Sequence, residues 1–163
     1  MENMYGATEL PRDKLDVAEA LTPGRRTAMS AIPDLMAANL LRIFNERNRR
    51  RRAAAIRAIY AKDCLFIDGR DSVVGWDGVH DTVERLQSVH PGFVFQATGL
   101  AVAHHGLACQ RWKFGPPDAC DVITGIDVAI FEKASIKALY VFIDRGAGAS
   151  RAGGWPPSPG YRV

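Results

Sequence analysis

The sequence has little cysteine, no long apolar run and no excess of positive charge in its central part. Its 163 residues include three cysteines, Cys64, Cys109 and Cys120, without CxxC spacing or an accompanying pair of histidines. This pattern argues against a zinc site and a disulfide framework, and it fits a reducing, cytoplasmic setting. No apolar run approaches 18 residues, and no basic segment followed by an apolar core opens the chain. We therefore expect neither a membrane span nor a signal peptide.

Charge is distributed unevenly along the chain. The net charge of the whole sequence is +3, yet residues 34–144 carry 14 Lys and Arg against 13 Asp and Glu residues. A nucleic-acid-binding module concentrates positive charge on a folded face, so this distribution argues against one. The Arg49–Arg52 run is the exception. No aromatic residues interleave with it, as stacking on bases requires, and we interpret the run as a solvated helix edge.

The composition divides the chain into a central domain and two extensions. With 47% hydrophobic residues, the length suits one domain with a substantial core. Scattered Gly, Pro and charge in residues 1–33 predict a partly mobile N-terminal extension. Residues 145–163 are rich in Gly and Pro, which predicts a flexible tail. The predicted domain therefore spans residues 34–144.

Three helices are predicted in the central domain. The first begins at Asp34, whose carboxylate can cap the first turn, and the second follows the Arg49–Arg52 run. The third begins at Asp77 and ends at the Pro91-Gly92 pair. Apolar residues at helical spacing form the stripes that we expect to face the core, namely Leu35, Leu40, Leu41 and Phe44 in the first helix and Val79, Val83, Leu86 and Val89 in the third.

The rest of the domain has the composition of strands. A short strand runs from Cys64 to Gly69. Longer runs rich in β-branched and aromatic residues cover 93–103, 107–114, 121–131 and 136–144. Because the long strands follow the helices, we expect an α+β domain in which helices cover one face of a curled, mainly antiparallel sheet.

Asp127 is a carboxylate at the centre of a strand-like run. Strand alternation places it on the same face as Ile123, Gly125 and Ala129. Apolar and small neighbours remove hydration from the carboxylate, which raises its pKa unless a cation or hydrogen-bond donors compensate. The alternative is a structural Asp that caps a loop amide or pairs with an Arg.

The order of these segments resembles the nuclear transport factor 2-like superfamily, and within it the SnoaL-like and ketosteroid isomerase-like group. The resemblance covers roughly residues 34–144 and rests on two helices, the segment YAKDCLFIDG, a helix opened by glycine, a long hairpin and the strand TGIDV. It implies a cone-shaped α+β fold with three N-terminal helices packed on a curled sheet that encloses a pocket. It also implies a homodimer, because Tyr140 and Phe142 lie on the strand face that this superfamily commonly buries between subunits.

The resemblance also implies roles for two carboxylates. In ketosteroid isomerases the general base is an Asp eight residues after a Tyr-Ala pair begins, a place that Asp68 holds after Tyr60. Their protonated hydrogen-bond donor is the Asp of an Ile-Asp-Val strand, which matches Asp127. A Tyr of the first helix falls at Phe44 in this chain, so one donor of the oxyanion hole is lost.

These residues lead to two hypotheses. If Asp68 and Asp127 face one apolar cavity, their pKa values separate, so that one acts as base and the other as acid. This pair suits an isomerase, polyketide cyclase-like enzyme or dehydratase that acts on a small hydrophobic carbonyl compound without cofactor or metal. The second hypothesis is a non-catalytic ligand-binding or dimerisation module, in which buried Arg or backbone groups satisfy both carboxylates.

Seven further residues are expected to line the cavity. They are Phe44, Phe66, Val83, Gln110, Trp112 and Leu139, with Trp76 at the mouth. The alternative is that Phe66, Trp112 and Leu139 are plain core and that Gln110 satisfies a backbone group. We expect the four histidines, His80, His90, His104 and His105, to be solvated.

Overall fold

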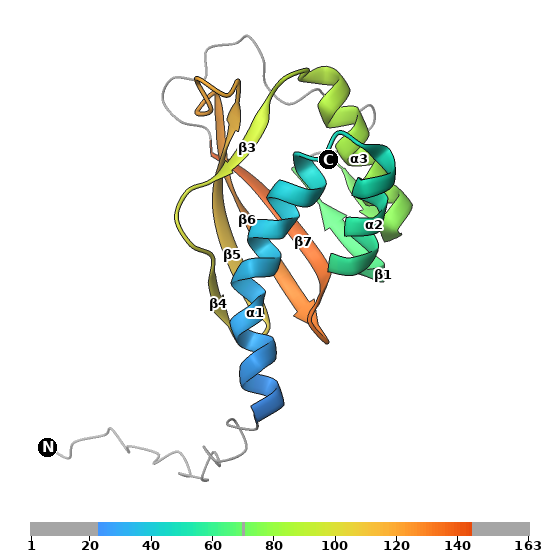
Figure 1. Cartoon of the computed structure of the whole chain (residues 1–163), viewed down its shortest axis with the longest axis vertical. Coiled ribbons are helices and arrows are strands. Elements are labelled where there is room, and N and C mark those ends of the chain that lie inside the picture. The colour runs from blue at the N-terminus through green and yellow to red at the C-terminus, as the bar shows by residue number, and fades with distance from the viewer. Residues whose placement is uncertain (1–22, 70, 145–163) are drawn as a thin grey trace, which may run out of the picture.

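The computed structural model describes residues 23–69 and 71–144 as an α+β fold. The helices are α1 (Pro23–Asn39), which continues into the π-helix η2 (Leu40–Phe44), α2 (Arg49–Ile59) and α3 (Gly75–Val89). The strands are β1 (Tyr60–Ile67), β2 (Ser72–Val74), β3 (Val94–Ala97), β4 (Val102–His104), β5 (Leu107–Gly115), β6 (Ile123–Glu132) and β7 (Ser135–Asp144). The α+β class and the mainly antiparallel pairing of the sheet are as predicted. The β1–β2 hairpin precedes α3, however, so the helices are not all N-terminal to the sheet (Figure 1).

Helix α1 begins at Pro23, well before the predicted start at Asp34, and Pro33 lies inside it. Ile32 and Met36 on this helix are both buried, and their packing offsets the backbone hydrogen bond that a proline cannot make. The predicted boundary between the N-terminal extension and the domain, after residue 33, thus falls within a helix. Residues 1–22 of the predicted extension and the tail predicted for 145–163 lie outside the described residues. The division of the chain into a domain and two extensions stays a prediction.

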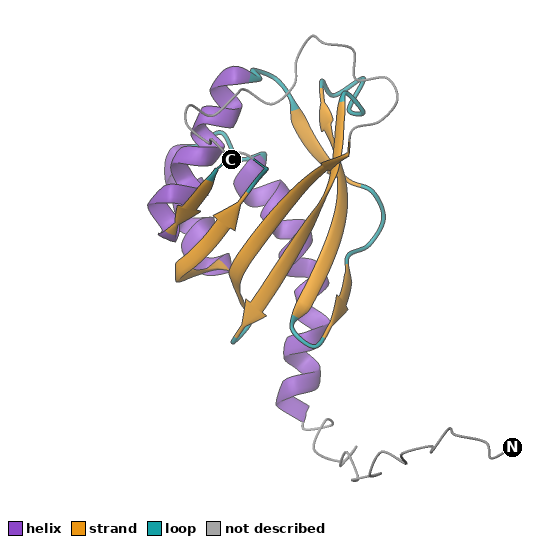
Figure 2. Cartoon of the chain, turned by 180° about the vertical axis from the view of Figure 1, so that it is seen from behind, coloured by secondary structure: helices purple, strands orange, loops and turns teal. Residues whose placement is uncertain are grey.

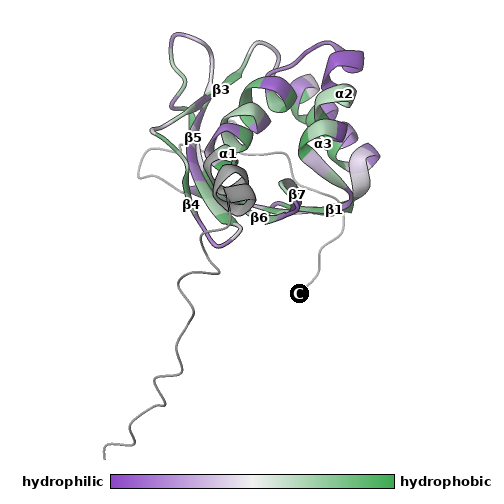
Figure 3. Cartoon of the chain, turned by 60° about the horizontal axis from the view of Figure 1, so that its bottom comes forward, coloured by the Kyte–Doolittle hydropathy of each residue, from purple (hydrophilic) through white to green (hydrophobic). Residues whose placement is uncertain are grey.

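The seven strands form one mixed sheet. Their order is β2-β1-β7-β6-β5-β3, and β4 pairs with β5 beside this path. The pair β1–β7 is parallel, whereas the other pairs among the described strands are antiparallel. Figure 2 shows the side of the sheet away from the helices. Figure 3 shows the sheet bending around α1, with β4 and β5 on one side and β1 and β7 on the other.

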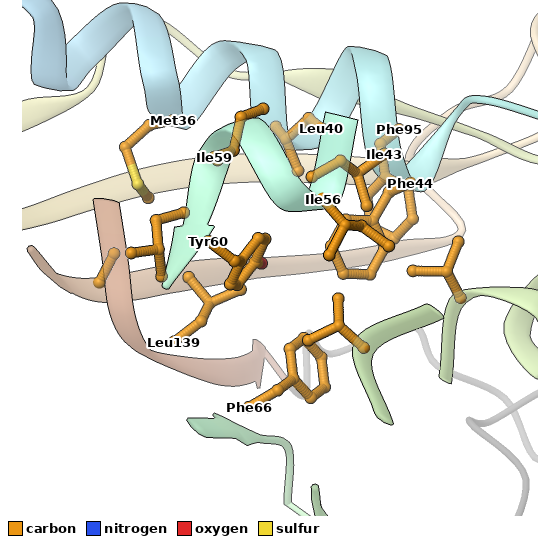
Figure 4. Packing of buried hydrophobic residues seen from close by; sticks show 14 of the residues in the cluster. Met36, Leu40, Ile43, Phe44, Ile56, Ile59, Tyr60, Phe66, Phe95 and Leu139 are labelled. Atoms are coloured by element: carbon orange, nitrogen blue, oxygen red, sulfur yellow. The ribbon is translucent and has the colours of Figure 1, made fainter. Parts of the chain in front are cut away.

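The core lies between the helices and the inner face of the sheet (Figure 4). Phe44 of η2 stacks on Phe66 of β1 with 6.0 Å between ring centroids, and Leu139 of β7 is fully buried. Leu41, which the sequence places on the inner stripe, is instead 59% exposed. The stripe continues through Ile43 because it follows the spacing of η2, and Leu41 is turned outward.

The arginine run at the start of α2 is only partly a solvated edge. Arg49–Arg51 are exposed, as predicted. Arg52 is buried, and its Nη1 donates to the backbone carbonyl of Glu46 at 2.9 Å and to Gln87 Oε1 at 3.1 Å. The side chain thus ties the start of α2 to α3, and the prediction of a solvated residue is wrong at Arg52.

The burial of three residues in and directly after helix α3 differs from the prediction. Val89, expected on the inner stripe, is the last helical residue and is 45% exposed. His80 and His90 are buried rather than solvated. The His90 ring packs against Phe93 at 5.0 Å and Phe114 at 5.5 Å between centroids. No helix in the described part of the chain is long and apolar enough to cross a membrane.

Candidate functional site

Asp127 lies in β6 on the inner face of the sheet. It is 3% exposed, and the indole Nε1 of Trp112 donates a 2.7 Å hydrogen bond to its Oδ1. Trp112 belongs to β5 and pairs with Gly125, two residues before Asp127. A Cβ atom at Gly125 would lie 2.5 Å from Trp112 Cζ2. Glycine at this position therefore leaves the space through which the indole reaches the carboxylate.

The environment of Asp127 shifts its acidity strongly. Burial raises the pKa of this carboxyl group to about 7, although the hydrogen bond from Trp112 lowers it. The direction is the one that the apolar strand pattern predicts. The carboxylate accepts its hydrogen bond from an indole and not from a guanidinium group. Near neutral pH the protonated and ionised forms coexist, which is the condition for an efficient general acid or base.

Asp68 follows β1 and is 6% exposed. Its Oδ1 accepts a 2.8 Å hydrogen bond from the backbone N–H of Asp71. Its own N–H donates to the Asp71 carbonyl oxygen at 3.0 Å. Asp68 thus closes the turn between β1 and β2, and these bonds hold its carboxyl group at the end of β1.

Strand register places Asp68 and Asp127 on the same face of the sheet. Phe66 pairs with Leu139 across the parallel strands β1 and β7. Because side chains alternate, the next inward position on β7 is Val141, which lies level with Asp68. Val141 pairs in turn with Asp127. Strand β7 therefore separates the two acidic residues, and two strand spacings amount to about 10 Å between their backbones.

The apolar residues expected around the carboxylates lie together in the core. Phe44, Phe66, Val83, Trp112 and Leu139 belong to one buried cluster. Rings connect its parts, because Phe95 packs against Phe44 at 5.3 Å and against Trp112 at 5.2 Å between centroids. The structure therefore brings these five residues together, and their contact with a ligand stays a prediction.

The two remaining predicted lining residues have backbone partners. Gln110 is buried, and its Nε2 donates to the carbonyl oxygens of Gly99 at 3.1 Å and Arg111 at 2.8 Å. This is the backbone role that the alternative interpretation gives it. Trp76 is half-buried, and its Nε1 donates to the Tyr60 carbonyl oxygen at 2.9 Å. Both side chains are therefore held in place by the fold itself.

Two functional candidates are missing from the sequence-based set. Asn39 and Tyr60 are buried, and the Tyr60 hydroxyl donates a 2.8 Å hydrogen bond to Asn39 Oδ1. Burial raises the pKa of Tyr60 well above its usual range, and the charge of Asp127 raises it further. Tyr60 thus lies within electrostatic range of Asp127. The signal that could have identified Asn39 is its place on an apolar helix stripe, between Met36 and Ile43.

One group of side chains in the described part of the chain has metal-ligand geometry. The ligand atoms of His80, Asp81 and Glu84 lie within 4.8 Å of one another. All three belong to α3, and Asp81 and Glu84 are exposed. Arg49 approaches Glu84 at 3.6 Å, which supplies a competing cation. Neither Asp68 nor Asp127 belongs to this group.

Solved structures identify the fold. A candidate isomerase of the SnoaL-like family from Agrobacterium tumefaciens str. C58 matches 72% of this chain and 98% of its own length, with TM-score 0.63 and 24% identity. A candidate SnoaL-like polyketide cyclase from Jannaschia sp. CCS1 matches 76% and 90%, with TM-score 0.61 and 9% identity. A nuclear transport factor 2-like protein of unknown function from Mesorhizobium loti matches 71% and 93%, with TM-score 0.54 and 14% identity. The chain has the fold of these nuclear transport factor 2-like and SnoaL-like proteins.

The nuclear transport factor 2-like fold confirms the resemblance seen in the sequence. At these identities the neighbours share architecture with this chain, and their names describe those proteins alone. No protein-family model and no curated protein matches the sequence. Any chemistry of this chain therefore depends on its own residues.

Proposed function

We propose that the protein is a cofactor-independent enzyme of the isomerase, cyclase or dehydratase type that acts on a small hydrophobic carbonyl compound. The observation that carries the proposal is Asp127, a buried carboxyl group whose pKa is about 7. Such a group can accept or release a proton near neutral pH. The names of the structural neighbours, a candidate isomerase and a candidate polyketide cyclase, support the same class.

In the proposed reaction Asp68 is the base and Asp127 is the acid. The Asp68 carboxylate takes a proton from the carbon beside the substrate carbonyl, and the electron pair of that C–H bond moves toward the carbonyl oxygen. Protonated Asp127 donates a hydrogen bond or its proton to this oxygen. Return of the proton held by Asp68 to another carbon gives isomerisation. Attack of the carbon on a second carbonyl, whose oxygen then takes that proton, gives cyclisation, and loss of a neighbouring hydroxyl group with that proton, as water, gives dehydration.

The reaction requires an enclosed pocket, and we propose that it lies between the helices and the bent sheet, as in a cone. Its walls are the residues predicted from the sequence, with Phe44, Phe66 and Leu139 nearest the middle and Trp76 at the mouth. The separation of about 10 Å between the backbones of Asp68 and Asp127 leaves room for a small substrate between their side chains. Apolar walls suit a hydrophobic ligand.

The test is exchange of protons beside a carbonyl group for deuterium. 2-Tetralone is incubated in D₂O with the protein, and deuterium incorporation is followed by proton NMR. We expect catalysis by the unchanged protein and a rate at least about 100-fold lower for Asp68→Asn. Asp63→Asn, at an exposed site on β1, is the matched control and should keep the full rate. Equal rates for Asp68→Asn and Asp63→Asn would remove Asp68 from the mechanism.

A non-catalytic ligand-binding or dimerisation module is the second candidate. The observation that favours it is the turn at Asp68, whose carboxyl group is held by the backbone N–H of Asp71 at 2.8 Å. A carboxylate with a structural role of this kind needs no reaction to explain its burial. A ligand-binding module predicts 2-tetralone binding without acceleration of deuterium exchange, and a dimerisation module predicts neither.

We also propose that two copies of the chain pair through the outer face of the sheet. Tyr140 pairs with Val128, and Phe142 pairs with Ile126, on the face opposite to Asp127. Phe142 is 55% exposed, and Ile130 on the same face is also exposed. Large apolar side chains grouped on an uncovered sheet face favour association, because burying them removes apolar surface from water.

A cytoplasmic setting is part of the same proposal. Cys64, Cys109 and Cys120 are free thiols, as is usual for proteins of reducing compartments. Burial raises the pKa of the Cys64 thiol, which keeps it in the unreactive protonated form.

A further inference from the structure

The side-chain amide of Asn39 is a buried polar group that the proposed proton transfer does not use. Asn39 is the last residue of α1 and is 0% exposed. Its Oδ1 accepts the 2.8 Å hydrogen bond from the Tyr60 hydroxyl. Its Nδ2 has no hydrogen-bond partner among the residues that the structure describes. A buried N–H group without an acceptor is unfavourable, and native proteins leave few of them.

Tyr60 fixes the direction in which the Asn39 amide points. The phenol lies among apolar side chains that include Met36, Leu40 and Leu139 (Figure 4). Its raised pKa keeps it protonated, so that it stays a donor to Oδ1. The two N–H bonds of Nδ2 therefore point away from the phenol and toward other parts of the core.

Asn39 and Asp127 are the centres of two buried hydrogen-bonded pairs, Tyr60–Asn39 and Trp112–Asp127, which together form a polar cluster linked by charge rather than by a direct contact. Tyr60 links them, because it donates to Asn39 and its own pKa is raised by the charge of Asp127. Trp112 completes the cluster through its hydrogen bond to Asp127. The unpaired amide of Asn39 thus lies in the neighbourhood of the group that we propose as the acid.

The backbone after Asn39 has a geometry that is common at functional sites. The π-helix η2 follows directly, and the Asn45 N–H donates to the Leu40 carbonyl oxygen, five residues back, at 2.9 Å. π-Helical turns are rare in proteins and occur frequently at functional sites. Leu40, Ile43 and Phe44 of η2 are buried and apolar, so Asn39 is the buried polar side chain at this end of α1.

We propose that Asn39 is a ligand-binding residue whose Nδ2 donates a hydrogen bond to a carbonyl oxygen of the substrate. The inference rests on the proposed function and names the chemistry by which the ligand is recognised. The substrate would therefore carry an oxygen acceptor as well as apolar surface. The acceptor would lie on the α1 side of the core. An amide donates at every pH in the working range, whereas Asp127 donates only in its protonated form.

This difference between an amide and a carboxylic acid supplies the test. The probes are 2-tetralone, which has a carbonyl acceptor, and tetralin, the hydrocarbon of similar shape without one. Dissociation constants are measured by ligand-observed NMR at pH 8.5, where Asp127 is mainly ionised. We expect the unchanged protein to bind 2-tetralone about tenfold more tightly than tetralin, the factor that one hydrogen bond at a buried site provides.

Substitution of the amide should remove this preference. In Asn39→Leu we expect the two probes to bind within about twofold of each other, with tetralin affinity nearly unchanged. Met36→Leu, a buried residue on the same helix, is the matched control and should keep the preference. A preference that persists in Asn39→Leu, or is absent from the unchanged protein although both probes bind, overturns the role of Asn39. Failure to bind either probe overturns the pocket, and with it the proposed function.

A second measurement needs no substitution that could disturb folding. The side-chain N–H₂ signals of Asn39 are followed in nitrogen-proton NMR spectra during addition of each probe. We expect one proton to move downfield with 2-tetralone and to remain in place with tetralin, because only the ketone accepts a hydrogen bond. Equal movement with both probes would contradict the inference.

Discussion

The indole Nε1 of Trp112 and the carboxylate Oδ1 of Asp127 lie 2.7 Å apart across neighbouring strands. Burial favours the protonated form of Asp127, and this hydrogen bond favours the ionised form. The pKa of about 7 is the balance between the two effects. The indole therefore lowers the fraction of Asp127 that is protonated near neutral pH, against the larger effect of burial.

Replacement of Trp112 by Phe should raise the pKa of Asp127 above about 7, because the donor that stabilises the carboxylate is lost. The measurement is a carbon NMR titration of the Asp127 carboxyl signal. Trp76→Phe is the matched control, since the Trp76 indole donates to a backbone carbonyl. A pKa that falls in Trp112→Phe would show that the hydrogen bond does not act as described.

Gly125→Ala should destabilise the protein. Its Cβ would lie 2.5 Å from Trp112 Cζ2 and would also crowd the Phe142 carbonyl oxygen. Overpacking of this kind costs roughly 1–3 kcal/mol in the free energy of unfolding, which urea denaturation measures. Gly69→Ala, where the added Cβ meets nothing within 4 Å, should leave stability within about 0.5 kcal/mol. Equal stability of the two variants would contradict the packing described at Trp112.

Asp127 should make the fold less stable as pH rises. Its pKa is about 7 in the folded protein against an ordinary 3.8, so the folded protein retains a proton that the unfolded chain releases. The stabilisation by this retained proton is fully present below the pKa of Asp127 in the unfolded chain. It is lost as pH rises through the pKa in the folded protein, and the loss in the free energy of unfolding is on the order of 4 kcal/mol.

The measurement is urea denaturation of the unchanged protein and Asp127→Asn across this pH range. Between pH 4 and pH 7 we expect the unchanged protein to lose stability relative to Asp127→Asn. Above pH 8 the difference in the free energy of unfolding should no longer change with pH. Asp118→Asn, an exposed site, is the control. A difference that does not depend on pH, or that changes in the opposite direction, would refute the burial of an acid at Asp127.

The outer face of the sheet should carry the subunit interface. Phe142→Glu places a charge at a residue that is 55% exposed in the single chain, and we expect it to turn a dimer into a monomer in analytical ultracentrifugation. Leu41→Glu, on the exposed side of η2, should leave the dimer intact. A monomeric unchanged protein, or a dimer in Phe142→Glu, would rule out this interface.

Local sequence patterns predict that Asp127 is buried, but they do not predict that Trp112 is its hydrogen-bond partner. Alternation along β6 is enough to assign Asp127 to a buried face, because the period of two belongs to the backbone itself. The contact with Trp112 depends on the register between β5 and β6, across 15 residues of chain. Register is set by packing and turn geometry together, so composition alone does not reveal it.

The parts that sequence reasoning missed depend on long-range packing. Helix α1 passes through Pro33 because Ile32 and Met36 pack on the core, which outweighs the local preference against proline. Asn39 is recognisable only as a polar residue on an apolar stripe, since its partner Tyr60 is 21 residues away. The parallel pairing of β1 with β7 joins the two ends of the sheet-forming sequence, and no local signal encodes it.

The pH dependence of deuterium exchange into 2-tetralone tests the proposed chemistry most directly. In the proposed reaction Asp127 acts in its protonated form, so the rate should fall on the alkaline side with a midpoint near pH 7. In Trp112→Phe this midpoint should move upward together with the pKa of Asp127. A rate that rises through pH 7, or an alkaline midpoint that does not respond to Trp112→Phe, would contradict the role of Asp127 as the acid.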